Sequence, residues 1–145
     1  MDWRADIEKL RRRKPRHILF LCVANSARSQ LAEGIARFYA PADVVISSAG
    51  SAPTHIRLEV IEVLREIGID ATPQFSKSLD DIAVSTVEAV ITLCAEEACP
   101  VFPGNVDRYH WPLADPAAIV GDMNDKLHAF RQIRDELTRR IRQMF

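Results

Sequence analysis

The sequence predicts an α/β fold, a three-layer sandwich built on a four-stranded parallel sheet. Short, continuously apolar stretches alternate along the chain with stretches whose apolar residues recur at helical spacing. The length of 145 residues suits one domain of ordinary size. The hydrophobic share of 48% is ample for a packed core, so it excludes a disordered chain.

Four stretches are expected to form the strands. Residues 17–22 come first, and their middle part, 18–21, is continuously apolar, as is typical of a strand buried on both faces. Residues 43–47 and 89–93 are expected to form the second and third strands. Residues 107–111 are expected to form the fourth strand.

Helices are expected between and after these strands. Apolar residues within 31–39 recur at helical spacing, and those within 60–67 mark a helix that Gly68 ends. Ser78 has the pattern of a capping residue before a short helix. The last helix is expected to carry a single apolar stripe within residues 123–141.

Two parts of the chain differ in character. Residues 1–16 are expected to form a charged arm that stays solvated, because five of the six residues at 11–16 are basic. Within the arm, residues 2–13 are expected to form a short helix, since three apolar residues share one face. Residues 17–145 are expected to form the functional domain.

Charge and hydropathy limit the binding partners. Nineteen Lys and Arg against twenty Asp and Glu give a formal net charge of −1, which argues against a dedicated nucleic-acid binder. The apolar run at 18–24 is too short for a signal peptide or a membrane span. The expectation is a cytoplasmic monomer that binds neither nucleic acid nor a membrane.

The segment between the first strand and the helix that follows it carries the clearest functional signal. Five residues separate Cys22 from Arg28, so the loop can curl until its backbone N–H groups point inward at a helix N-terminus. Such a nest binds tetrahedral oxyanions, and Arg28 can add a bidentate clamp. The same positive field stabilises a thiolate at Cys22, to which Ser29 can donate a hydrogen bond. The expected oxyanion-binding residues are Val23, Ala24, Asn25, Ser26, Ala27, Arg28 and Ser29.

Two further cysteines favour redox chemistry. Cys22 ends one predicted strand and Cys94 directly follows another, and ligands of parallel sheets sit at the carboxyl ends of strands. In a reducing compartment, three thiols indicate a catalytic, redox or metal-binding role. Four residues separate Cys94 from Cys99, unlike the closely paired ligands of zinc sites, so the spacing argues against a zinc site, while incidental thiols and a soft metal stay as alternatives.

The loop resembles the signature of the low-molecular-weight protein tyrosine phosphatases and of the arsenate reductases built on the same fold. The resemblance covers residues 17–145, and the three cysteines favour thioredoxin-coupled arsenate reductases over phosphatases. It rests on the segments Gln30-Leu31-Ala32-Glu33-Gly34, Ser48-Ala49-Gly50, Thr92-Leu93-Cys94, Cys99-Pro100, His110-Trp111 and Asp115-Pro116-Ala117.

The resemblance implies a relay without a cofactor. Cys22 attacks arsenic, Cys94 attacks Cys22 and expels arsenite, and Cys99 then takes over the disulfide. Thioredoxin is the implied reductant, with glutaredoxin or a low-molecular-weight thiol as alternatives because the link 95–98 is two residues shorter than usual. Oxidation is expected to rearrange residues 94–104 and bring the disulfide to the surface.

The resemblance also implies a general acid. Asp115, which otherwise would be part of a common Asp-Pro turn, matches the family's proton donor to the leaving oxygen. Ala117 and Ala118 follow where phosphatases often carry aromatic residues, which favours a small inorganic substrate such as arsenate or a phosphate-like oxyanion.

Four residues are expected to support the loop from behind: Asn25, Glu33, Ser48 and Lys77. The first three match positions where some family members hold a potassium ion. Lys77 stands where a further acidic ligand is expected, so its ammonium can substitute for the cation, and no metal is assigned. The alternative for Lys77 is an ordinary surface lysine.

Two other functions compete with arsenate reduction. A phosphatase would use Cys22, Arg28 and Asp115 in the same roles and would not need Cys94 or Cys99 for turnover. A module that captures arsenite or a soft metal through three thiolates would need neither Arg28 nor Asp115.

Overall fold

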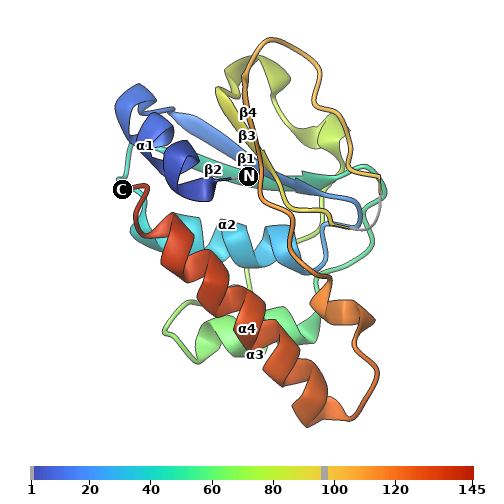
Figure 1. The fold of residues 1–145 in the computed structure, drawn as a ribbon. Coiled ribbons are helices and arrows are strands. Elements are labelled where there is room, and N and C mark those ends of the chain that lie inside the picture. The colour runs from blue at the N-terminus through green and yellow to red at the C-terminus, as the bar shows by residue number, and fades with distance from the viewer. Residues whose placement is uncertain (1, 96–97) are drawn as a thin grey trace.

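Four parallel strands form the centre of the protein, and the computed structural model describes residues 2–95 and 98–145 around them (Figure 1). Their order in the sheet is β2-β1-β3-β4. The strands are β1 (His17–Cys22), β2 (Val45–Gly50), β3 (Ala89–Thr92) and β4 (Asp107–His110).

The first strand holds the central place that its apolar sequence predicts. All six residues of β1 are buried, because β1 has a partner strand on each side and a packed layer on each face. Cys22 pairs with Gly50 of β2, and the neighbouring Leu21 pairs with Thr92 of β3. The ends of three adjacent strands therefore meet at one edge of the sheet.

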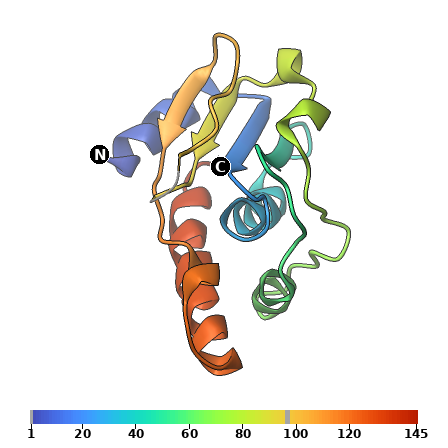
Figure 2. The ribbon, with the colours of Figure 1, turned by 90° about the vertical axis from the view of Figure 1, so that its right-hand side faces the viewer.

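Both faces of the sheet are covered. On one face lie α2 (Arg28–Tyr39) and α4 (Met123–Ile141), with α3 (Leu58–Arg65) packed against both (Figure 2). The opposite face carries a smaller core, covered by two short 3-10 turns, η1 (Leu79–Asp81) and η2 (Val84–Thr86). The three-layer α/β prediction is confirmed. None of the helices among the described residues combines the length and apolar character that crossing a membrane requires.

The predicted strand bounds differ most from the structure at β2. The strand predicted at 43–47 lies at Val45–Gly50, whereas the third and fourth strands each end one residue earlier than predicted. Ser48, Ala49 and Gly50 lack the side chains that favour strands, yet they are buried because they pair with the end of β1. Tertiary pairing extends this strand beyond its apolar run.

The N-terminal segment is a helix, α1 (Trp3–Arg13), that packs on the domain. The expectation of a solvated arm is wrong for one face of it, because Ile7 and Leu10 are buried in the main core. The polar face makes three contacts that run antiparallel along β4 and past its end. Arg13 pairs with Asp107 at 3.3 Å, the Lys9 ammonium lies 5.7 Å from the ring centre of Tyr109, and Trp111 donates to Asp6 at 2.9 Å.

A carboxylate at the end of α3 joins this helix to α4. Glu66 accepts hydrogen bonds from Arg131 and Arg134, at 2.7 Å to each in the closest contacts. These arginines, Arg131 first, lower the pKa of Glu66 from 4.5 to about 2. A depressed carboxyl pKa stabilises the fold above pH 4.5, and that stabilisation is lost as the pH falls toward 2.

Glu66→Gln is expected to lower the free energy of unfolding by about 1 kcal/mol at pH 7, because the amide loses its charge attraction to the partly exposed Arg131 and the buried Arg134. Urea denaturation at pH 7 and pH 3 would measure this difference between the variant and the wild type. The difference should shrink at pH 3; an equal difference at both pH values would contradict the assignment. Glu62→Gln, which breaks only a pair with Arg65 next to it on the helix surface, is the matched control.

Candidate active site

The loop after β1 crosses the carboxyl edge of the sheet and leads into α2. Asn25 adopts a left-handed backbone conformation with φ of 49°. Among the described residues other than glycine, only Lys14 shares a positive φ, so Ala24 fits the loop without that strain. The carbonyls of Val23, Ala24 and Ser26 accept hydrogen bonds at 2.9, 3.1 and 3.0 Å from the N–H groups of Ala52, Thr54 and Arg57. The carbonyls of the loop thus point outward and bind the segment 52–57. A nest of inward N–H groups requires this arrangement.

Gly50 lies directly beneath this loop. A Cβ atom built at Gly50 would overlap the backbone carbonyl of Val23 and lie 3.0 Å from the backbone nitrogen of Asn25. Backbone atoms cannot move aside as a flexible side chain can. The last position of β2 therefore requires glycine so that the loop can cross it.

The amide of Asn25 links the loop to the residues behind it. Its Nδ2 donates to Ser29 Oγ at 2.8 Å and to Ser48 Oγ at 2.9 Å. Its Oδ1 accepts from Gln30 Nε2 and from the backbone N–H of Lys77, both at 2.9 Å. These two donors fix which end of the amide faces the serines.

This orientation determines the direction of the hydrogen bond to Cys22. The Cys22 Sγ lies 2.8 Å from Ser29 Oγ. Because Ser29 Oγ already accepts from Asn25, its own O–H is available to donate to the sulfur. Cys22 is only 3% exposed, so its sulfur lies in a buried position beside a hydrogen-bond donor and the N-terminus of α2.

A buried carboxylate ends the same chain of contacts. Ser48 Oγ donates to Glu33 Oε1 at 2.6 Å. The Glu33 side chain is 1% exposed, and its charge is balanced by Lys77 Nζ at 3.3 Å and by Arg37 at 3.2 Å. Lys77 also donates to the carbonyl of Phe75 at 2.8 Å. The structure thus brings together the four residues expected to support the loop, and Lys77 is more than an unattached surface lysine.

Arg28 is buried at the first position of α2. Its Nη1 donates to the carbonyl of Leu113 at 2.9 Å and lies 3.5 Å from the carbonyl of Leu93. Its Nη2 lies 3.9 Å from Asp115 Oδ2. The other oxygen of Asp115 accepts from the N–H of Ala117 at 2.9 Å, which caps a 3-10 turn, η3 (Pro116–Ala118). Arg28 and Asp115, predicted separately, therefore belong to one site.

The second cysteine lies at the same edge as the first. The N–H of Leu93 donates to the carbonyl of Leu21 at 3.0 Å, so Cys94 directly follows a residue tied to the end of β1. Cys94 is 1% exposed, whereas Cys99 is only partly buried. All three cysteines are described and free of disulfides. The segment 94–104, which is expected to rearrange on oxidation, includes residues 96 and 97, which lie outside the described residues.

The low molecular weight phosphotyrosine protein phosphatase family matches residues 17–145 of this chain. The chain belongs to this family. An arsenate reductase of Halalkalibacterium halodurans is 38% identical over 127 residues, which cover 86% of this chain and 91% of that protein.

Solved structures of arsenate reductases are also similar to this chain. A structure described as an arsenate reductase in the phosphate binding state superposes with a TM-score of 0.72 at 25% identity, covering 87% of this chain and 93% of the other. A thioredoxin-dependent arsenate reductase of Corynebacterium glutamicum has a TM-score of 0.62 at 29% identity, covering 95% and 69%.

Sequence reasoning missed three side chains behind the phosphatase-family loop. Gln30 donates to the backbone carbonyls of Asn25 and Phe75, and Gln74 in turn donates to Gln30. Ser76 donates to the carbonyl of Asn25 at 2.6 Å. Gln30 lies within the family segment, so its position was the available signal, whereas Gln74 and Ser76 form no motif.

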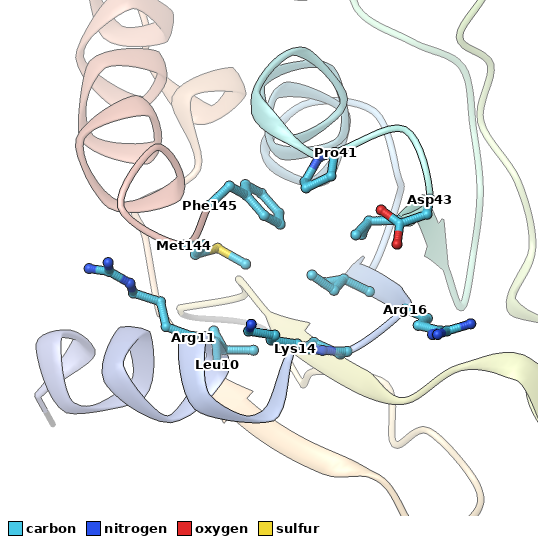
Figure 3. A pocket seen from close by; sticks show the side chains of 11 residues that line it. Leu10, Arg11, Lys14, Arg16, Pro41, Asp43, Met144 and Phe145 are labelled. Atoms are coloured by element: carbon cyan, nitrogen blue, oxygen red, sulfur yellow. The ribbon is translucent and has the colours of Figure 1, made fainter.

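A separate pocket of about 570 Å³ lies at the opposite edge of the sheet (Figure 3). The pocket is lined by basic residues from the end of α1 and from the linker to β1, and by apolar residues. Its labelled lining residues are Leu10, Arg11, Lys14, Arg16, Pro41, Asp43, Met144 and Phe145. Because the phosphatase-family loop lies at the carboxyl ends of the strands, this pocket is distinct from the candidate active site.

Proposed function

We propose that this protein is an enzyme that reduces arsenate to arsenite through a relay of cysteine thiols. The observation that carries the proposal is that two buried cysteines, Cys22 and Cys94, lie at the same edge of the sheet. Cys22 also begins a loop suited to oxyanions. Relatives named arsenate reductase share 35–38% identity over most of the chain. A phosphatase needs only one such cysteine, so the second one favours reduction.

In the first step, the loop N–H groups and Arg28 bind arsenate, which resembles phosphate in shape and charge. The Cys22 thiolate attacks arsenic and forms a sulfur–arsenic bond. Asp115 donates a proton to the departing oxygen, which leaves as water. Arsenic keeps its oxidation state in this step.

In the second step, the Cys94 thiolate attacks the Cys22 sulfur. The electron pair of the sulfur–arsenic bond passes to arsenic, which is reduced from As(V) to As(III) and leaves as arsenite. The two sulfurs are oxidised to a Cys22–Cys94 disulfide. Cys99 then attacks Cys94, which releases the Cys22 thiolate, and a dithiol such as thioredoxin reduces the Cys94–Cys99 disulfide. Since the relay needs reduced thiols, we place the reaction in the cytoplasm. We propose that the protein acts as a monomer.

Arsenate-dependent oxidation of NADPH through thioredoxin reductase and thioredoxin tests this proposal. We expect sustained oxidation with thioredoxin, and a parallel assay with glutathione and glutaredoxin identifies the alternative reductant. Hydrolysis of a phosphate ester without any arsenate-dependent oxidation would instead favour the phosphatase function, which the family match supports. The metal-capture alternative is weaker, because residues 2–95 and 98–145 contain no group of three His, Cys, Asp or Glu side chains able to hold a metal ion.

Asp115→Asn is expected to slow formation of the sulfur–arsenic bond by roughly 10²–10⁴-fold, because the amide cannot supply the proton. Rapid-mixing measurements of a single turnover would follow this step, while thiol titration would verify that the cysteines still oxidise. Asp80→Asn, on an exposed turn, is the control. A wild-type rate for Asp115→Asn would show that another group is the acid.

Lys77→Ala is expected to weaken phosphate inhibition roughly threefold to tenfold, because the buried Glu33 would keep only the half-exposed Arg37 as a counter-charge. Potassium should restore part of the loss by occupying the place of the ammonium, whereas tetramethylammonium is too large to do so. The inhibition constant of phosphate, measured in both salts, reports this effect. Equal salt responses of the variant and the wild type would rule out the substitution of a cation by Lys77.

A further inference from the structure

The helix α1 precedes the part of the chain that matches the family, yet its contacts lead to the active site. We infer that α1 is a positioning element for Arg28 and Asp115, acting through the hydrogen bond between Asp6 and Trp111. The inference rests on the proposed function, in which Arg28 binds the oxyanion and Asp115 supplies the proton.

The first step is the attachment of α1 to Trp111. Asp6 Oδ2 accepts a hydrogen bond of 2.9 Å from the indole Nε1 of Trp111, a residue only 1% exposed. The burial of Ile7 and Leu10 in the main core holds the helix in place for this contact. Without Asp6, the indole N–H would lose a hydrogen-bond partner in a buried position, which is costly. The indole is therefore fixed in position by α1.

The second step leads from Trp111 to the arginine. The N–H groups of Trp111 and Leu113 donate to the carbonyls of Thr92 and Leu93 at 2.8 and 3.1 Å, so this segment continues beside the end of β3. The carbonyl of Leu113 in turn accepts from Arg28 Nη1 at 2.9 Å. The group that holds the guanidinium is thus two residues from the indole that α1 fixes.

The third step adds the acid. Asp115 lies two residues beyond Leu113, and its Oδ2 is 3.9 Å from Arg28 Nη2. Both charged groups of the site therefore depend on the placement of one segment, 111–115. A shift of Trp111 would move the carbonyl and the carboxylate that set the position of the guanidinium, so it would alter oxyanion affinity.

Calorimetric titration of the full chain with inorganic phosphate tests the inference. Asp6→Ala should weaken phosphate binding roughly threefold to tenfold, because only part of the effect of the lost hydrogen bond reaches Arg28 through the segment 111–113. Asp6→Asn keeps an acceptor oxygen for the indole and should bind phosphate almost as the wild type does. Arg13→Gln is the matched control, because it breaks the ion pair of α1 with Asp107 at the other end of the helix.

Trp111→Phe provides an independent break of the same bond. It should weaken phosphate binding as Asp6→Ala does, and the double variant should add little to either single change. A merely structural role of α1 would lower the melting temperature and the number of binding sites while leaving the dissociation constant unchanged. That result, or equal dissociation constants for the wild type and Asp6→Ala, would overturn the inference.

The titration needs no arsenate turnover. It can therefore contradict the positioning role of α1 without contradicting the proposed arsenate reduction, and the reverse. The predicted order of phosphate affinities in a protein that does not reduce arsenate would overturn the proposed function alone. A wild-type chain that binds no phosphate would overturn both.

Discussion

Cys22→Ser is expected to abolish arsenate reduction and any phosphatase activity. A serine hydroxyl is far less ionised than a thiol under the same conditions, so the variant lacks a nucleophile. The loop contacts that bind an oxyanion, including those of Asn25 and Arg28, remain in the variant. Phosphate should therefore still bind, as calorimetry can measure, while NADPH oxidation in the coupled assay falls to background.

The retained phosphate binding is the internal control for this variant. Binding without turnover would separate the loss of chemistry from a collapse of the loop. Appreciable turnover by Cys22→Ser, with either arsenate or a phosphate ester, would refute its role as the nucleophile.

Cys94→Ser is expected to abolish repeated arsenate turnover while leaving hydrolysis of a phosphate ester close to the wild-type rate. In the proposed relay, attack of Cys94 on Cys22 is the step that passes electrons to arsenic, and a serine cannot form the disulfide. Hydrolysis of a phosphate ester would use Cys22, Arg28 and Asp115, none of which changes. The coupled assay and a chromogenic phosphate ester measure the two activities on the same sample.

Cys99→Ser is the matched control for this second variant. It should allow the first release of arsenite and stop at the Cys22–Cys94 disulfide, which mass spectrometry of the intact protein would detect. Unimpaired arsenate turnover by Cys94→Ser would exclude the relay.

The residues that could be predicted from sequence are those whose local pattern decides their structure. The apolar run of β1 predicted its bounds correctly, and the pattern at Ser78 predicted a capped short helix, which the structure contains as the three-residue 3-10 helix η1. The spacing of Cys22 and Arg28 similarly indicated a loop between a strand and a helix. Each of these features depends on interactions within a few residues of the chain.

The features that sequence could not predict depend on distant backbone atoms. Arg28 donates to the carbonyl of Leu113, which is 85 residues away, and a carbonyl leaves no mark on the sequence. The end of β2 pairs with β1 despite its small and polar residues. The helix α1 packs through Ile7 and Leu10 against a core built from distant parts of the chain, so its charged sequence alone predicted a solvated arm.

The outward carbonyls of the loop have a consequence for its dynamics. The amides of Ala52, Thr54 and Arg57 can exchange their hydrogens with solvent only when they separate from the loop. Any anion that holds the loop closed must oppose that separation. The hydrogen-exchange rates of those three amides therefore report how often the loop separates from them.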